Sequence, residues 1–168
     1  MKSNLRKYLF LLLSVCAYYG VHEGAHLLYA LFTGVFKGIN FLGLGIQIDI
    51  FAEGLSDMQL AAFCLVGPLA TLIIGYIMAF RAKSICLSPS KIFKAGCFYS
   101  TISLLLIDPI YLSILCGLVG GGDMNGIVLI IPEIAARVIS GVIMVINVSI
   151  LITQVYPVYK SAFADLVW

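Results

Sequence analysis

Apolar residues along this chain form four long runs separated by more polar stretches. The runs extend over roughly 8–36, 59–80, 93–118 and 132–156. Each is long enough to cross a bilayer as a helix, which takes about 20 residues. Basic residues precede the first run, as in a signal peptide. That run has no small-residue cleavage site and continues apolar beyond residue 26, so we interpret it as a retained helix.

The first connection has a different period from the helices around it. Over residues 38–51 glycine is frequent, and apolar side chains then alternate with polar ones. This alternation is typical of a strand. A strand cannot face lipid with its backbone unpaired, so it must lie against protein or at the interface. The predicted fold class is an all-α integral membrane protein with about four transmembrane helices and a short membrane-associated β-strand or hairpin between the first and second.

The other two connections differ from each other in charge. The second carries four basic residues around a Ser-Pro-Ser sequence and is expected to be a polar loop. The third, over 117–126, is rich in glycine and is expected to be irregular. In a four-span chain, the basic N-terminus and the basic second connection lie on one side, and the positive-inside rule makes that side cytosolic. We therefore expect a multi-pass protein of the cell membrane with both termini in the cytosol.

Composition agrees with this class. Hydrophobic residues make up 62% of the 168 residues, charged residues only 11%, and the mean hydropathy is +1.10. Soluble domains contain about 25% charged residues. The net charge of +2 is thinly spread without a basic patch, so nucleic acid is not an expected partner. The length suits a single membrane-embedded domain over 1–168.

The strongest chemical signal is the sequence His22-Glu23-Gly24-Ala25-His26. On a helix, residues four apart lie on one face, so His22 and His26 can direct both imidazoles at one ion. Glu23 can then reach a water at that ion. This is the HExxH arrangement of zinc peptidases, and these are the only histidines in the chain. The alternative is a buried histidine pair that hydrogen-bonds within the protein.

Catalytic zinc takes three protein ligands and leaves a fourth position open. No histidine remains, and the five cysteines include no close-spaced pair, so we expect a carboxylate as third ligand. Asp123 is favoured, because the glycines before it let the backbone bend and approach another helix. Asp108 is the alternative, either as the ligand or as a group that hydrogen-bonds to one. The remaining candidates are Asp49, Glu53, Asp57, Glu133 and Asp165.

These features together resemble the site-2 protease family of intramembrane zinc metalloproteases. The resemblance rests on His22 to His26, on Gly67-Pro68-Leu69-Ala70-Thr71 in the second run, and on Asp123 after a glycine-rich segment. It covers about residues 8–126, which would be the metalloprotease core, with 132–156 as a C-terminal helix. The sequence departs from the family where Thr71 replaces a usual asparagine and where Met124 follows Asp123. Asn125 is a candidate substitute for the asparagine that stabilises the oxyanion in that family.

The resemblance implies an intramembrane zinc metalloprotease that cleaves transmembrane or membrane-associated peptides. His22, His26 and Asp123 would hold Zn²⁺, and Glu23 would act as the general base. Asp108, Thr71 and Asn125 would support the site. Two other functions remain open: a transporter or channel lined by buried ionisable residues, and an inactive metal-binding scaffold in the membrane. The sequence also leaves open whether a membrane partner regulates access.

Overall fold

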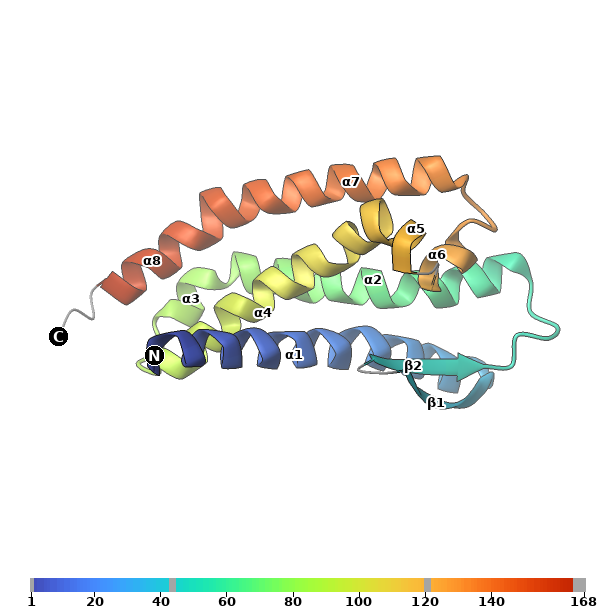
Figure 1. Ribbon diagram of the computed structural model, residues 1–168, viewed down its shortest axis with the longest axis horizontal. Helices are drawn as coiled ribbons and strands as arrows, with labels where there is room; N and C mark the ends of the chain where they lie inside the picture. Colours follow the sequence, from blue (N-terminus) through green and yellow to red (C-terminus); the bar gives the residue numbers. More distant parts are fainter. Residues whose placement is uncertain (1, 43–44, 120–121, 165–168) are drawn as a thin grey trace.

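The computed structural model describes residues 2–42, 45–119 and 122–164 and is mostly helical (Figure 1). Four long helical stretches alternate with short elements. The elements in chain order are α1 (Lys2–Thr33), β1 (Phe36–Leu42), β2 (Gly45–Ile50), α2 (Asp57–Phe80), α3 (Ala82–Cys86), α4 (Lys91–Ile110), the π-helical turn η1 (Tyr111–Leu115), α5 (Cys116–Val119), α6 (Gly122–Ile127), α7 (Glu133–Ile150), the π-helical turn η2 (Leu151–Val155) and α8 (Tyr156–Ala164).

The long helices run side by side, and the short elements gather at their two ends (Figure 1). α1 contacts α2, α4 and β2, while α4 also contacts α7. The hairpin, α5 and α6 lie toward one end of the bundle. The start of α1, α3 and α8 lie toward the other end. α6 contacts α2, so two helices that are far apart in the sequence pack against each other.

α2 allows this close packing because its buried face is made of small residues. Its start is fixed by a capping box, in which Ser56 and Gln59 exchange side-chain and backbone hydrogen bonds. Small residues let membrane helices approach closely. The buried residues of α2 are Ala61, Gly67, Pro68, Thr71, Gly75 and Ala79.

The helix geometry of α4 changes from α-helical to π-helical just after Pro109. Proline lacks the backbone donor of a regular helix, and the chain continues directly into the π-helical η1. Ser113 donates a hydrogen bond of 2.5 Å to the carbonyl of Pro109. Wider turns of this kind are frequent at functional sites, and here η1 brings Tyr111 and Leu115 to a cavity described below.

The hairpin predicted from the alternating pattern is confirmed. β1 and β2 are antiparallel, with Ile39 opposite Ile48 and Phe41 opposite Ile46. Two connections differ from expectation. Part of the second, expected as a polar loop, forms the short helix α3, and part of the third, expected as irregular, forms α6. Isolated helices of five or six residues leave no periodicity in a sequence and depend on packing to form.

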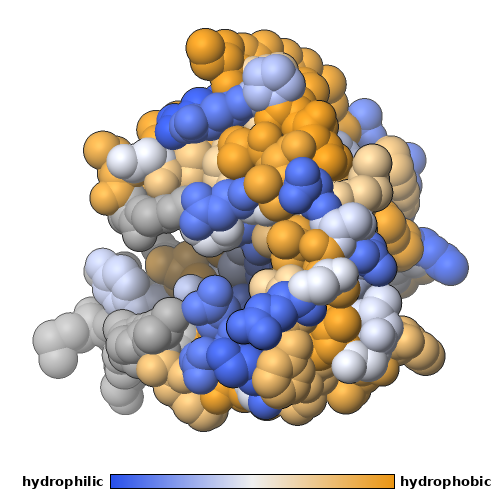
Figure 2. Space-filling model, turned by 90° about the vertical axis from the view of Figure 1, so that its right-hand side faces the viewer, coloured by the Kyte–Doolittle hydropathy of each residue, from blue (hydrophilic) through white to orange (hydrophobic). Residues whose placement is uncertain are grey.

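Within the described residues, three helical segments are long and apolar enough to cross a membrane. They are Asp57–Phe80, Lys91–Leu118 and Glu133–Ala164. The expected first span, in α1, is not among them, because His22, Glu23 and several tyrosines lower its hydropathy. Four spans therefore stay a prediction. Many large apolar side chains are nevertheless exposed, among them Leu12 of α1, Ile73 of α2 and Val142 of α7. Apolar patches are also visible on the face shown in Figure 2.

Candidate metal centre

One stripe of α1 faces the protein interior, and most of its residues are polar. Residues four apart lie one above another on a helix. The buried stripe consists of Ser14, Tyr18, His22, His26 and Ala30. The leucines of the opposite face are exposed, so α1 turns polar side chains inward and apolar side chains outward.

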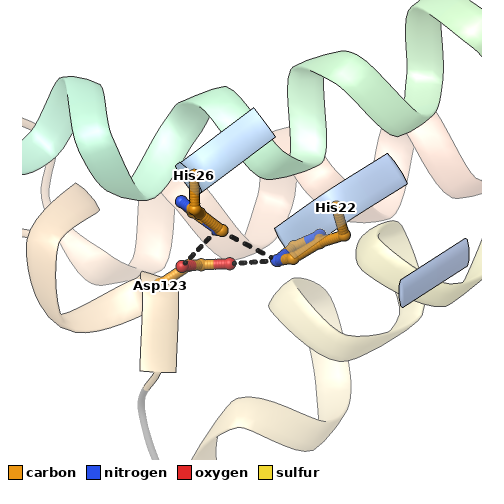
Figure 3. A group of neighbouring side chains, drawn as sticks. All are labelled: His22, His26 and Asp123. Atoms are coloured by element: carbon orange, nitrogen blue, oxygen red, sulfur yellow. Dashed lines mark hydrogen bonds and ion pairs between the residues drawn. The ribbon is translucent and has the colours of Figure 1, made fainter. Parts of the chain in front are cut away.

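His22 and His26 meet Asp123 of α6 at the centre of this stripe (Figure 3). His22 Nε2 lies 3.1 Å from His26 Nε2 and 3.1 Å from Asp123 Oδ2. His26 Nε2 lies 3.4 Å from Asp123 Oδ1. Ligand atoms about 2.0 Å from one tetrahedral zinc ion are roughly 3.3 Å apart. Two imidazole nitrogens and one carboxylate at these separations fit the donor set and the spacing of a zinc site.

The two imidazoles pack directly against Gly67 of α2. A Cβ atom at this position would lie 2.5 Å from His26 Nε2 and 2.9 Å from His22 Nε2. Both distances are shorter than any ordinary van der Waals contact. The absence of a side chain at Gly67 therefore creates the space in which the histidine nitrogens converge, and this part of the Gly67-Pro68 motif serves a close helix contact.

Glycine also allows α6 to bring Asp123 into place. Gly122 has a φ of 31°, in the left-handed region that side chains disfavour. Gly126 lies against α2, where a Cβ atom would overlap the thiol of Cys64. The glycine-rich segment thus permits a turn and a close approach. Asp123 itself is partly exposed, with its carboxylate toward the two histidines.

A second carboxylate lies on the far side of His22. Asp108 of α4 lies 3.2 Å from His22 Nδ1 and accepts hydrogen bonds from the hydroxyls of Tyr18 and Thr71. The Thr71 contact measures 2.5 Å. The structure therefore brings both carboxylates favoured by the sequence to His22, with Asp123 on Nε2 and Asp108 on Nδ1. His26 is different, because its Nδ1 has no hydrogen-bond partner among the described residues.

A cavity of about 680 Å³ opens beside these residues. Figure 2 looks onto the end of the bundle that carries the hairpin, and the molecule is visibly hollowed there. Glu23 lines this cavity, and its Oε2 accepts a hydrogen bond of 3.2 Å from the backbone N–H of Ile48 in β2. Asp123 and both histidines also line it. The carboxylate expected to act as base therefore shares one open space with the three candidate ligands.

Neither Asn125, the candidate to stabilise the oxyanion, nor Thr71, at the usual asparagine position, lines the cavity. Thr71 is fully buried and turned toward Asp108. Asn125 is exposed on α6 and is not among the residues that line the cavity. Tyr111, from η1, does line the cavity and lies next to Gly122, where a Cβ atom would be 2.6 Å from its hydroxyl.

The remaining carboxylates lie outside the cluster. Asp49 is paired with Lys37 on the hairpin at 2.9 Å, and this hydrogen bond lowers the pKa of the Asp49 carboxyl. Glu133 is paired with Arg137 at 2.7 Å in the first turns of α7. Glu53 is exposed beyond β2. The others are Asp57, in the first turn of α2, and Asp165, which lies outside the described residues.

Sequence reasoning did not identify Tyr18 as part of this site, and it named Gly67 only within the Gly67-to-Thr71 motif, without a role beneath the histidines. Tyr18 precedes His22 by four residues, so the helical period of α1 already places it on the same face. The role of Gly67 depends on contact between two helices, and no spacing within either helix encodes it.

No family model matches this chain, and no curated protein or solved structure matches it. The interpretation of the site therefore rests on the residues and their geometry.

Proposed function

We propose that this chain is an integral membrane zinc metalloprotease that cleaves transmembrane or membrane-associated peptides. The observation that carries the proposal is the convergence of His22, His26 and Asp123 in a cavity that also contains Glu23. Three protein ligands with an open side are typical of catalytic zinc, whereas structural zinc sites are closed by four. A glutamate next to the first histidine on the same helix supplies the base.

In this mechanism three residues bind the metal and a fourth, Glu23, transfers protons. Zinc held by the two histidines and Asp123 would polarise the scissile carbonyl and make a water molecule more acidic. Glu23 takes the proton from that attacking water and delivers it to the leaving amine nitrogen. The hydrogen bond from Ile48 fixes the Glu23 carboxylate at the edge of the cavity.

β2 supports a peptide as substrate. Ile46, Gln47 and Ile48 of this strand line the cavity. An extended peptide can add to a strand edge through backbone hydrogen bonds. A helical substrate hides its carbonyls in internal hydrogen bonds, so it must unwind before attack, and β2 offers it replacement partners.

A transporter would use buried ionisable residues as a pathway across the membrane. Glu23, Asp108 and Asp123 instead line one cavity, toward one end of the bundle. Arg137, a fourth residue of such a pathway, is paired with Glu133 and is not among the residues that line the cavity. The arrangement favours a single reaction site over a path.

Metal content tests the ligand set. We expect the purified wild-type protein in detergent to contain one zinc ion per chain, and Asp123→Ala to lose it as fully as His26→Ala does. The reason is that each variant removes one of the three proposed ligands. Elemental analysis by inductively coupled plasma mass spectrometry measures this directly.

Asp49→Ala provides the matched control, because it removes a half-buried carboxylate that pairs with Lys37 and does not line the cavity. This variant should keep its zinc. Zinc retained by Asp123→Ala but lost from Asp108→Ala would transfer the ligand role to Asp108. Wild-type protein without zinc would refute the proposed function.

Orientation in the membrane can be tested by labelling. Glu53 and Ser84 are exposed and lie in connections at opposite ends of the bundle. In a background without native cysteines, Glu53→Cys should react with an impermeant thiol reagent outside cells. Ser84→Cys should be protected, because the basic connection around it is retained in the cytosol.

The opposite labelling pattern would invert the topology. The zinc site would then open toward the cytosol, since it lies nearer the hairpin end of α1. Labelling of both cysteines in intact cells would contradict a membrane-spanning arrangement of α2.

A further inference from the structure

The carboxylate of Asp108 is buried in apolar surroundings, yet it is held from three directions. Only 1% of the residue is exposed. Tyr18 of α1 and Thr71 of α2 each direct a hydroxyl at it, and His22 Nδ1 lies 3.2 Å and 3.3 Å from its two oxygens. A carboxylate buried in a protein is costly unless it is paired and hydrogen-bonded. The protein nevertheless buries this carboxylate beside Nδ1 of His22, which indicates a function for Asp108 beyond helix packing.

We infer that Asp108 is a positioning residue that makes His22 a strong metal ligand. The inference rests on the proposed zinc site. An ionised carboxylate only accepts hydrogen bonds, so its contact with Nδ1 places the imidazole proton on that nitrogen. The lone pair is then on Nε2, which faces His26 and Asp123. Histidine ligands of metals commonly donate their other N–H to a carboxylate in this way.

Thr71 acts on the site through Asp108, whereas Tyr18 also approaches His22 directly, with its hydroxyl 3.3 Å from Nδ1. Their hydroxyls fix the carboxylate relative to α1 and α2, so the orientation of His22 depends on three helices at once. His26 has no such support: its ring packs against Phe63, with the ring centroids 4.7 Å apart, and its Nδ1 is without a partner among the described residues. The two histidines are therefore unequal, and His22 is the one held rigidly.

Asp108 also balances charge. A divalent cation held by two neutral imidazoles and Asp123 leaves one positive charge in an apolar region. The carboxylate of Asp108, one imidazole away, compensates that charge. Charged groups at membrane depth are usually paired in this manner.

The test is metal affinity, measured by competition between the detergent-solubilised protein and a chelator of known zinc affinity. Asp108→Asn keeps the shape of the side chain and removes its charge, and we expect it to weaken zinc binding about 10–100-fold. Thr71→Val and Tyr18→Phe should weaken it by smaller factors. Tyr76→Phe is the matched control, since it removes the hydroxyl of a half-buried tyrosine that donates to Asn147 outside the site. Its zinc affinity should equal that of wild type.

Cobalt substitution supplies a second readout. The visible absorption of bound Co²⁺ reports ligand geometry, so the band should shift in Asp108→Asn and stay in place in Tyr76→Phe. An unchanged zinc affinity and cobalt spectrum in Asp108→Asn would overturn the inference. Loss of all metal from Asp108→Asn with retention in Asp123→Asn would also overturn it, because Asp108 would then be a ligand. Wild-type protein that binds zinc but cleaves no peptide would refute only the proposed function.

Discussion

Glu23→Gln is expected to keep its zinc and to lower peptide cleavage by about 10²–10⁴-fold, which is the usual contribution of a general base. Glutamine has the shape of glutamate, and its carbonyl can still accept the hydrogen bond from Ile48. It cannot accept the proton of the attacking water. The measurement is cleavage of a library of transmembrane peptides in detergent, followed by mass spectrometry, with the zinc content determined on the same samples.

Glu53→Gln is the control for this experiment, because Glu53 is an exposed glutamate outside the cavity. Its cleavage rate should match that of wild type. Zinc loss in Glu23→Gln would mean that Glu23 is a ligand and not a base. Undiminished cleavage by Glu23→Gln would exclude the mechanism altogether.

Gly67→Ala is expected to disable the site although it changes no polar group. The added methyl carbon would lie 2.5 Å from His26 Nε2. Either α2 must move away from α1 or both imidazoles must turn, and overpacking of this kind costs about 1–3 kcal/mol of stability. A displacement of about 1 Å at a reaction site lowers activity by about 10²-fold. We therefore expect much weaker zinc binding and at least this loss of cleavage.

The chain offers a close control in Gly24→Ala, within the same HExxH sequence. A Cβ atom at Gly24 meets nothing within 4 Å. Alanine is favoured over glycine inside a helix by up to about 1 kcal/mol, so this variant should bind zinc normally and unfold at a slightly higher temperature. Equal zinc affinities of Gly67→Ala and Gly24→Ala would show that the close contact of Gly67 with the two imidazoles has no role in metal binding.

The sequence predicts those parts of this molecule that depend on short-range periodicity. The positions of α2, α4 and α7 follow from runs of apolar residues, and the hairpin follows from alternation in 38–51. The pairing of His22 with His26 follows from a spacing of four on one helix. Each of these patterns lies within a single element, so a sequence can carry it without knowledge of the fold.

Other parts depend on contacts between distant segments. Asp108 and Asp123 are both aspartates near the end of an apolar stretch, and only the packing of α4 and α6 on α1 assigns them to different nitrogens of His22. Thr71 matches the position of an asparagine in the resembled family, yet its hydroxyl contacts Asp108 because α2 turns it toward α4. The short helices α3 and α6 were likewise not predictable, since packing stabilises them.

The polar stripe of α1 has a consequence for how the chain enters a membrane during synthesis. Ser14 contacts Ser103, Tyr18 contacts Asp108 and His22 contacts both Asp108 and Asp123. All of these partners are synthesised after α1. α1 therefore leaves the ribosome before the helices that supply its polar partners, and lipid alone cannot satisfy its inner face. We expect α1 to remain beside the insertion machinery until α4 has emerged, so that a nascent chain ending before α4 would be handled as unassembled and degraded.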